Sequence, residues 1–201
     1  MSDSQALRTH LRQRRDSLKN DEITRASAQV CERLGNSSLI RNKQHIAFYY
    51  AQGGEINPDA LLLRALEMGQ HCYLPVLHQD GSNRLKFAPF QLDRKLRPNR
   101  YGIPEPVCNP DELIEAQQLD LVLLPLVAYD PAGNRVGMGK GYYDRTFSFL
   151  KTRQRPGRPL LIGLAHSFQQ TPQLTPHSWD VSLDAIVNEH QLTLFTPAGK
   201  T

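Results

Sequence analysis

The sequence has few cysteines and no long apolar run. Cys31, Cys72 and Cys108 are far apart and form no CxxC pair, which excludes the usual zinc and dithiol redox motifs and predicts reduced thiols. The longest apolar run, residues 121–128, is less than half of the roughly 20 residues that a membrane-spanning helix needs. Residues 1–15 are polar and lack the apolar core of a signal peptide. We therefore expect a cytoplasmic protein without a membrane segment.

The net charge is also small, and the sequence has no internal repeats. An excess of +4 over 201 residues favours anionic ligands without identifying one. Part of it lies on one predicted helix face, where the guanidinium groups of Arg8, Arg12 and Arg15 can converge. No linker divides the chain, and its length suits one domain that buries a core without disulfides. We predict a single domain over residues 1–201 and expect a monomer.

Helical and strand patterns alternate along the chain. Residues 3–35 carry leucines at helical spacing and are predicted to form one or two helices, the second capped by Asn20 or Asp21 and ending at Gly35. A helix that begins at Pro58 lies between the first two predicted strands and completes a βαβ unit. The predicted strands cover residues 45–50, 71–77, 84–90, 119–127, 159–165 and 183–187.

The composition of these segments indicates the fold class. Residues 119–127 are almost continuously apolar, as in a central parallel strand that is covered on both faces. Residues 84–90 alternate in polarity and are predicted to form an arm of a hairpin. Residues 101–106 contain two prolines, which cannot donate to a ladder, and are predicted to form a loop. The sequence therefore predicts a single three-layer α/β/α domain with a mostly parallel central sheet.

The segment most suggestive of chemistry is residues 130–145, DPAGNRVGMGKGYYDR. It follows the buried strand and precedes a helix predicted for residues 142–152, so it lies at the carboxyl edge of the sheet, where open α/β proteins bind ligands. Its alternating glycines would let backbone N–H groups approach an anion, and the N-terminus of the helix would add positive potential. Arg135 and Lys140 add charge that suits a polyphosphate. A tight strand–helix turn with incidental charge is the alternative explanation.

Several common site patterns are missing. A dinucleotide-binding GxGxxG motif requires glycine where Tyr142 stands. The histidines show no metal-ligand spacing, and no GxSxG or Cys–His pattern predicts covalent catalysis. Trp179 either packs against the core or borders a site, and both alternatives stay open.

Several motifs, in order, resemble those of the 5-formyltetrahydrofolate cyclo-ligases, also called methenyltetrahydrofolate synthetases. The stretch PLVAYDPAGNRVGMGKGYYDR carries the strongest likeness, and LRTHLRQRR, FYYAQGGEI, YGIPEP and VSLDAIVNE match over nearly the whole chain. The resemblance implies a fold like that of the NagB/RpiA/CoA-transferase-like group. It also implies an ATP- and Mg²⁺-dependent conversion of 5-formyltetrahydrofolate, with or without a polyglutamate tail, to 5,10-methenyltetrahydrofolate, ADP and phosphate.

The reaction implied by this resemblance explains the residue types. The N5-formyl group is amide-like and too unreactive for N10 to close onto it directly, so the γ-phosphoryl group of ATP is first transferred to the formyl oxygen. Phosphoryl transfer requires in-line positioning and stabilisation of spreading negative charge. A glycine-rich loop, cations and a metal ion supply both.

The resemblance also implies which residues bind ATP and Mg²⁺. Arg8 and Arg12 would hold the phosphates, although a solvated basic helix face is the ordinary alternative. Lys140 would be the catalytic group that stabilises the moving phosphoryl group. Asp144 and Asp184 would be the Mg²⁺ ligands, although a helix-start carboxylate and a strand-end polar residue look the same in sequence. The nucleotide loop as a whole would comprise Arg135, Val136, Gly137, Met138, Gly139, Lys140, Gly141, Tyr142 and Tyr143.

On the folate side, the resemblance assigns a second catalytic residue. Glu55 matches the glutamate that contacts folate and would orient N10 and the formyl group by hydrogen bonding. Asp130 matches the Asp after the central strand and is predicted to organise the loop rather than to catalyse. Aromatic or apolar faces can cover the flat pteridine, and the substrate-lining positions would be Tyr50, Tyr101, Met138 and Tyr142.

Three other functions stay open. Residues 84–100 hold six basic side chains and one acidic one with interleaved phenylalanines, a composition compatible with nucleic-acid binding, but no known reading motif appears. A sugar-phosphate isomerase of similar fold is possible because fold does not determine function. A folate-binding relative without catalysis is the third alternative. We expect small-molecule substrates and no nucleic-acid partner.

Overall fold

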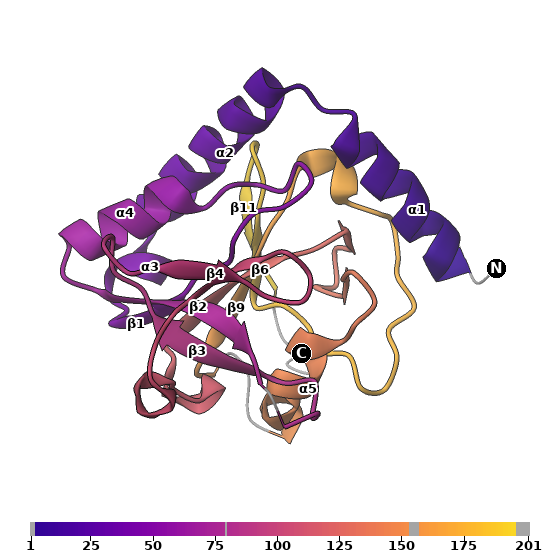
Figure 1. Cartoon of the computed structure of the whole chain (residues 1–201). Helices are drawn as coiled ribbons and strands as arrows, with labels where there is room; N and C mark the ends of the chain where they lie inside the picture. Colours follow the sequence, from indigo (N-terminus) through magenta and orange to yellow (C-terminus); the bar gives the residue numbers. More distant parts are fainter. Residues whose placement is uncertain (1–2, 79, 153–156, 196–201) are drawn as a thin grey trace.

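A seven-stranded sheet forms the centre of the molecule (Figure 1). The structure is a computed structural model that describes residues 3–78, 80–152 and 157–195. From one edge to the other, the sheet consists of β11 (Leu192–Leu194), β10 (Ala185–Val187), β9 (Leu160–Leu164), β6 (Leu121–Pro125), β1 (His45–Ala47), β2 (His71–Leu77) and β3 (Leu85–Pro89). Only the outermost pairs, β10–β11 and β2–β3, are antiparallel. The predicted mostly parallel sheet and the hairpin arm at 84–90 are thereby confirmed.

Helices cover both faces of this sheet and confirm the predicted α/β/α layering. On one face lie α2 (Asn20–Gly35), α3 (Ser38–Arg41) and α4 (Asp59–Glu67). On the other face lie α5 (Tyr142–Thr146) and two 3₁₀ turns, η2 (Ala116–Gln118) and η3 (Ser148–Thr152). The first helix, α1 (Asp3–Asp16), stands apart from both layers in Figure 1. Among the described helices, none combines the length and the apolar character needed to cross a membrane.

Alternate side chains of the central strands build two separate apolar cores. In β6, Leu121 and Leu123 pack with α2 and α4, whereas Val122 and Leu124 pack with the opposite layer. Successive side chains of a strand point to opposite faces of a sheet. Because both faces of this sheet are covered, the segment reads in sequence as an uninterrupted apolar run.

After the neighbouring strands β1 and β6, the chain continues towards opposite edges of the sheet. From β1 it passes through α4 to β2, which confirms the predicted βαβ unit, whereas from β6 it proceeds to β9 and β10 on the other side. Open α/β sheets bind ligands beyond the carboxyl ends of the strands at such a switch point. The topology therefore places a ligand site beyond the ends of β1 and β6.

Two predicted helix ends are wrong. The helix expected over residues 142–152 stops at Thr146 and continues as the 3₁₀ turn η3. The hydroxyl of Thr146 donates to the carbonyl of Tyr142 (2.7 Å), a back-bond that bends helices, and it also accepts the N–H of Leu85 (2.8 Å). The helix α2 begins one position earlier than the predicted caps imply, after Lys19, whose N–H donates to the side chain of Glu22 (2.8 Å).

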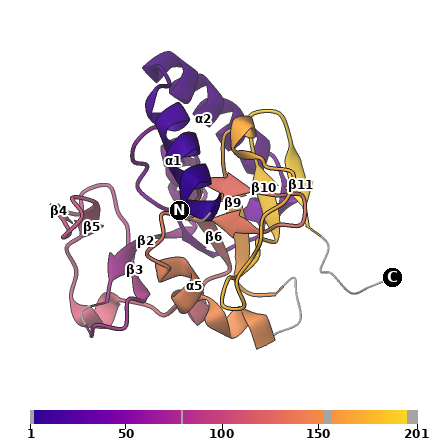
Figure 2. The same cartoon turned by 90° about the vertical axis from the view of Figure 1, so that its right-hand side faces the viewer.

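The predicted loop over residues 101–106 is also wrong in part, because Pro104–Pro106 form strand β5, which pairs antiparallel with β4 (Leu96–Pro98). The N–H of Asn99 donates to Ile103 and that of Val107 to Lys95, both at 2.8 Å. Paired residues in an antiparallel ladder alternate between bonded and non-bonded positions. The prolines occupy the non-bonded positions, where no N–H is required. Figure 2 shows this β-ribbon standing beside β2 and β3.

The outer edge of β3 is occupied by other parts of the chain. The N–H of Leu85 donates to Thr146, as described, and Phe87 exchanges two backbone hydrogen bonds with Ile114 (3.1 and 2.9 Å). Pro89, the next outward-facing position, has no N–H. These contacts attach β3 to α5 and to the segment that precedes β6.

The three cysteines form no disulfide. Burial raises the pKa of the Cys31 thiol to about 11 and that of the Cys72 thiol to about 12. Both thiols are therefore protonated at neutral pH, and only the thiolate is nucleophilic. Cys108 is half-buried.

Candidate active site

A large cavity, with a volume of about 1860 Å³, lies at the carboxyl edge of the sheet. Its wall includes parts of α1, the loop after β1, the β4–β5 ribbon, the glycine segment and residues 173–180. Pockets for one small ligand have volumes of roughly 300–1000 Å³, so this cavity has room for two substrates. With the exception of Asp184, every residue to which the sequence analysis assigned a ligand lies on this wall.

Asp130 organises the hairpin that carries the glycine segment, as the sequence predicts. The hairpin consists of β7 (Ala128–Tyr129) and β8 (Arg135–Val136). The Asp130 side chain is buried, and its Oδ1 accepts the N–H groups of Ala132 (3.0 Å) and Asn134 (2.9 Å). Its Oδ2 accepts the N–H of Leu174 (2.9 Å). One carboxylate thus joins the glycine segment to a part of the chain more than forty residues away.

The loop over residues 137–141 lines the cavity. Gly139 and Gly141 have φ angles of +91° and +64°, which L-residues with side chains rarely adopt. The side chain of Arg8 donates to the carbonyl of Gly137 (3.1 Å), and that of Arg145 donates to the carbonyl of Lys140. In the described part of the chain, no acceptor is bonded to an N–H of this loop. Such a run of N–H groups is suited to an anion.

The predicted help from a helix N-terminus is small. The helix α5 has only five residues, and the partial charge at a helix end grows from the alignment of many peptide dipoles. The attraction of anions to this region therefore comes from the loop N–H groups and from basic side chains.

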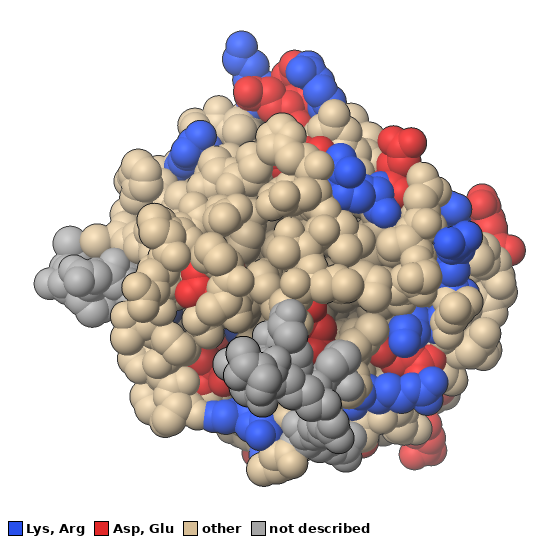
Figure 3. Space-filling model, turned by 180° about the vertical axis from the view of Figure 1, so that it is seen from behind, with Lys and Arg blue, Asp and Glu red and all other residues tan. Residues whose placement is uncertain are grey.

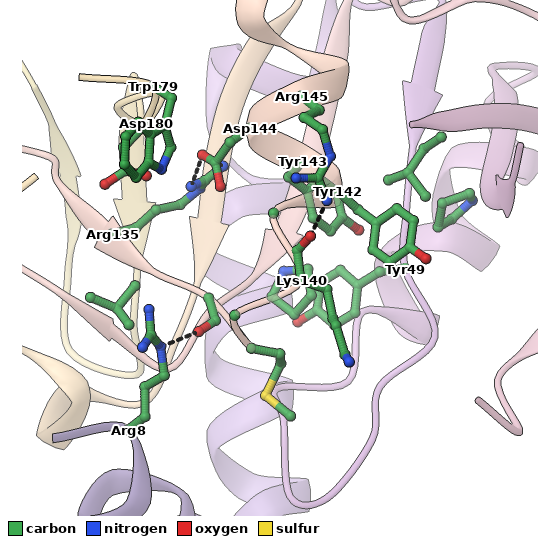
Figure 4. A pocket seen from close by; sticks show the side chains of 18 of the residues that line it. Arg8, Tyr49, Arg135, Lys140, Tyr142, Tyr143, Asp144, Arg145, Trp179 and Asp180 are labelled. Atoms are coloured by element: carbon green, nitrogen blue, oxygen red, sulfur yellow. Dashed lines mark hydrogen bonds and ion pairs between the residues drawn. The ribbon is translucent and has the colours of Figure 1, made fainter. Parts of the chain in front are cut away.

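The buried cation Arg135 is already paired with a carboxylate. Both terminal nitrogens of Arg135 lie 2.9 Å from Asp144 Oδ1 (Figure 4). The same oxygen accepts the N–H of Val181 (3.2 Å). Asp144 therefore lines the cavity as part of an ion pair and holds the segment around Val181 against α5.

Asp184, which the resemblance assigns to the metal, is not among the residues that line the cavity. Its Oδ2 accepts the N–H of Leu161 (2.8 Å) near the amino end of β9, away from the carboxyl edge where Asp144 lies. Within the described residues, no group of three or more His, Cys, Asp or Glu side chains could hold a metal ion. The oxygen chemistry of Asp144 suits Mg²⁺ only if phosphate oxygens and water supply most of the ligands.

Glu55 is held by a buried arginine that the sequence analysis left without a role. Arg15 Nη1 lies 3.3 Å from Glu55 Oε1, and the two side chains are only 4% and 9% exposed. Arg15 also donates to the carbonyls of Gly53 (2.8 Å) and Leu126 (3.4 Å). Burial raises the pKa of Glu55, and the charge of Arg15 opposes that rise. The position of Arg15 on a basic helix face gave no sign that it would be buried.

The turn before Glu55 requires glycine. Gly54 has a φ of +74°, and a Cβ there would lie 2.6 Å from the carbonyl oxygen of Arg15. The ring of His166 forms a hydrogen bond from Nε2 to the carbonyl of Gly54 (2.9 Å). Burial lowers the pKa of His166, which favours the neutral ring. The turn is thus held between α1 and the end of β9.

Aromatic side chains also line the cavity, next to the glycine loop. Tyr50 lies beyond the end of β1 and faces the cavity, while its neighbour Tyr49 is buried. The hydroxyls of Tyr101 and Tyr142 are 3.1 Å apart, and Arg100 also donates to Tyr142. The hydrogen bonds from Tyr101 and Arg100 lower the pKa of Tyr142. These contacts join the turn of the β4–β5 ribbon to the glycine loop.

The basic segment 84–100 does not form a continuous positive surface. Lys86 pairs with Glu115 and Arg94 with Glu112, each at 2.7 Å. The opposite face of the molecule, which Figure 3 shows, also has intermixed acidic and basic side chains among its described residues. Neither observation favours a nucleic-acid interface.

Comparisons with known proteins identify the family of this chain. The model of the 5-formyltetrahydrofolate cyclo-ligase family matches residues 1–189. The 5-formyltetrahydrofolate cyclo-ligase of Haemophilus influenzae is 34% identical over 179 residues, or 89% of this chain and 94% of the relative. That of Escherichia coli K12 is 30% identical over 178 residues, or 88% and 95%. The chain belongs to the 5-formyltetrahydrofolate cyclo-ligase family.

Solved structures agree with this assignment. A 5,10-methenyltetrahydrofolate synthetase from Aquifex aeolicus superposes with a TM-score of 0.81 at 27% identity, covering 98% of this chain and 95% of the other. One from Mycoplasma pneumoniae gives 0.72 at 25% identity, covering 94% and 99%. The family resemblance stated from the motifs is confirmed, and the cyclo-ligase family makes this chain an enzyme of folate metabolism.

The wall of the cyclo-ligase cavity contains one segment that the sequence analysis missed. Residues 173–180 line it, although they carry no periodic pattern or glycine motif. Trp179, left undecided by the sequence, borders the cavity and is 63% exposed. In the sequence, the only signal that could have drawn attention to this segment is the presence of Trp179 itself.

We expect Asp130→Ala to destabilise the cyclo-ligase fold by about 3 kcal/mol, because the N–H groups of Ala132, Asn134 and Leu174, the last of them buried, lose a charged acceptor. Urea denaturation followed by circular dichroism measures this change. Asp111→Ala, which removes an exposed carboxylate, is the matched control and should leave the midpoint unchanged. Equal midpoints for the two variants would contradict the organising role of Asp130.

Proposed function

We propose that this chain converts 5-formyltetrahydrofolate to 5,10-methenyltetrahydrofolate, coupled to conversion of ATP to ADP and phosphate. The observation that carries the proposal is the position of the loop over residues 137–141. At Gly137 the loop is bonded to Arg8 of α1, and at its other end Tyr142 is bonded to Tyr101. The loop thus borders both the arginines of α1 and the Tyr101–Tyr142 pair within one cavity, and these groups suit a triphosphate and a pteridine.

The first step transfers the γ-phosphoryl group of ATP to the formyl oxygen. This transfer turns an unreactive, amide-like oxygen into part of a leaving group. Arg8, Arg12 and the loop N–H groups bind the phosphates. Lys140 balances the charge that spreads over the moving phosphoryl group.

The second step closes the ring. N10 attacks the activated carbon, the bond from that carbon to the phosphorylated oxygen breaks, phosphate leaves, and N10 loses its proton. Glu55 accepts a hydrogen bond from N10–H and so orients it. Because burial raises the pKa of Glu55, its carboxylate is a better proton acceptor than an exposed one. Tyr50 and Tyr101 cover the flat faces of the substrate.

A magnesium ion bound together with the phosphates would supply charge neutralisation. Asp144 is the carboxylate that we propose as its protein ligand. We also propose that a single chain is sufficient, because the residues proposed to bind ATP and those proposed to bind the folate line the same cavity.

The direct test is an absorbance assay for methenyltetrahydrofolate formed from 5-formyltetrahydrofolate. We expect product with ATP and Mg²⁺ together and none when either is omitted. Absence of product in the complete mixture would refute the proposed function, and product without ATP would refute its coupling to phosphoryl transfer.

Lys140→Ala is expected to lower kcat by about 100-fold or more, because a preorganised charge near the transferring group is lost. The KM for 5-formyltetrahydrofolate should change much less. Lys95→Ala removes an exposed lysine outside the cavity and should leave kcat unchanged. A Lys140→Ala enzyme as active as the Lys95→Ala enzyme would remove Lys140 from the mechanism.

Arg15→Met is expected to move the acid limb of the pH–activity profile to higher pH. Arg15 lowers the pKa of Glu55, so its loss raises that pKa, and the carboxylate form then requires a higher pH. Arg15→Lys keeps the charge and should move the limb less, and Arg25→Met, at an exposed position on α2, should not move it. An unmoved limb in folded Arg15→Met protein would contradict this role.

A further inference from the structure

The segment from Leu174 to Val181 is fixed at both ends and forms one side of the cavity. Leu174 packs on Leu11 of α1 and donates its N–H to Asp130. Val181 donates its N–H to Asp144. Between these two anchors, the segment runs along the cavity wall from α1 to α5. None of its residues has a role in the mechanism proposed above.

A tight turn within this segment builds a flat aromatic surface. The N–H of His177 donates to Asp180 Oδ2 (2.8 Å), and the N–H of Asp180 donates back to the carbonyl of His177 (3.0 Å). The rings of His177 and Trp179 are stacked, with centroids 4.6 Å apart and planes inclined by 15°. The turn therefore brings the two rings into stacking contact.

Trp179 is exposed in a way that suits a ligand rather than a core. Its side chain is 63% exposed, and it belongs to none of the described apolar clusters. With one face against His177, the ring still offers most of its surface at the cavity wall. An exposed tryptophan in a fixed orientation is a preorganised stacking surface.

The surface lies near the Arg135–Asp144 pair, on the side of the cavity towards α1. Figure 4 shows Trp179 and Asp180 beside the Arg135–Asp144 pair, whereas Tyr142 and Lys140 lie across the view. The anchor at Leu174 also places the segment next to the helix that carries Arg8 and Arg12. A nucleotide whose phosphates contact these arginines and the loop N–H groups would extend its base towards this segment.

We propose that the stacked His177–Trp179 pair is the platform for the purine base of the nucleotide, an inference that rests on the proposed use of ATP. The pteridine has other aromatic partners, because Tyr50, Tyr101 and Tyr142 also line the cavity, and Tyr142 lies across it from Trp179 in Figure 4. Stacking on the platform recognises the flat face of the base, whereas the loop and the arginines recognise the phosphates. The base and the phosphates of the nucleotide are therefore bound by different residues, whose contributions can be measured separately.

Trp179 is the only tryptophan of the chain, so its emission reports directly on this surface. We expect ATP and adenosine monophosphate to quench the emission of the wild-type protein, because stacked bases quench indole fluorescence. Inorganic tripolyphosphate, which has no base, should bind in calorimetry without equal quenching. Binding of ATP without a change in emission would overturn the platform alone, whereas absence of ATP binding would overturn the proposed function as well.

Kinetics of variants separate this role from a structural one. Trp179→Ala should raise the KM for ATP by about tenfold or more, the range expected for loss of base stacking, with the KM for 5-formyltetrahydrofolate and the affinity for tripolyphosphate unchanged. Trp179→Phe should restore most of the ATP affinity. Leu92→Ala, at a 73% exposed position outside the cavity, should change neither KM. A selective rise in the folate KM would instead assign the platform to the pteridine and overturn the proposal.

Discussion

The guanidinium of Arg15 is buried where three separate parts of the chain meet. It bonds to the carbonyls of Gly53 and Leu126 and to the carboxylate of Glu55. Gly53 follows β1 and Leu126 follows β6, so the cation spans the switch point of the sheet, while Arg15 itself belongs to α1. Because a buried charge that loses its partners costs several kcal/mol, helix, turn and strand end are held as one unit. The cavity takes its shape from this unit.

The lining of the cavity combines aromatic side chains with charged ones. Tyr49 is buried and Tyr143 partly buried in the cavity wall, and burial raises the pKa of both hydroxyls. The charge of Arg135 is balanced locally by Asp144. Electrostatic interactions are stronger where water is excluded. A small number of side chains on the walls can therefore have a large effect on a phosphoryl group, although the net charge of the whole chain is only +4.

What the sequence predicts well is what depends on local pattern. The strand at 119–127 follows from apolar continuity, and the glycine segment follows from an ordered motif, so both were placed correctly. The position of Asp184 away from the cavity lining could not be predicted, because a carboxylate that binds the N–H of Leu161 has the same local sequence as a metal ligand. The burial of Arg15 and the course of residues 173–180 depend on contacts between distant parts of the chain, such as the one from Asp130 to Leu174. No local pattern encodes such contacts.

The outer edge of β3 affects the tendency of the protein to aggregate. An open edge strand is a template on which another molecule can add a strand, and repeated addition leads to aggregation. On β3, the outward N–H of Leu85 is taken by Thr146 and that of Phe87 by Ile114, and Pro89 has none. An incoming strand therefore finds no donor at these three positions. The edge is closed to edge-to-edge growth by the same contacts that attach α5 to the sheet.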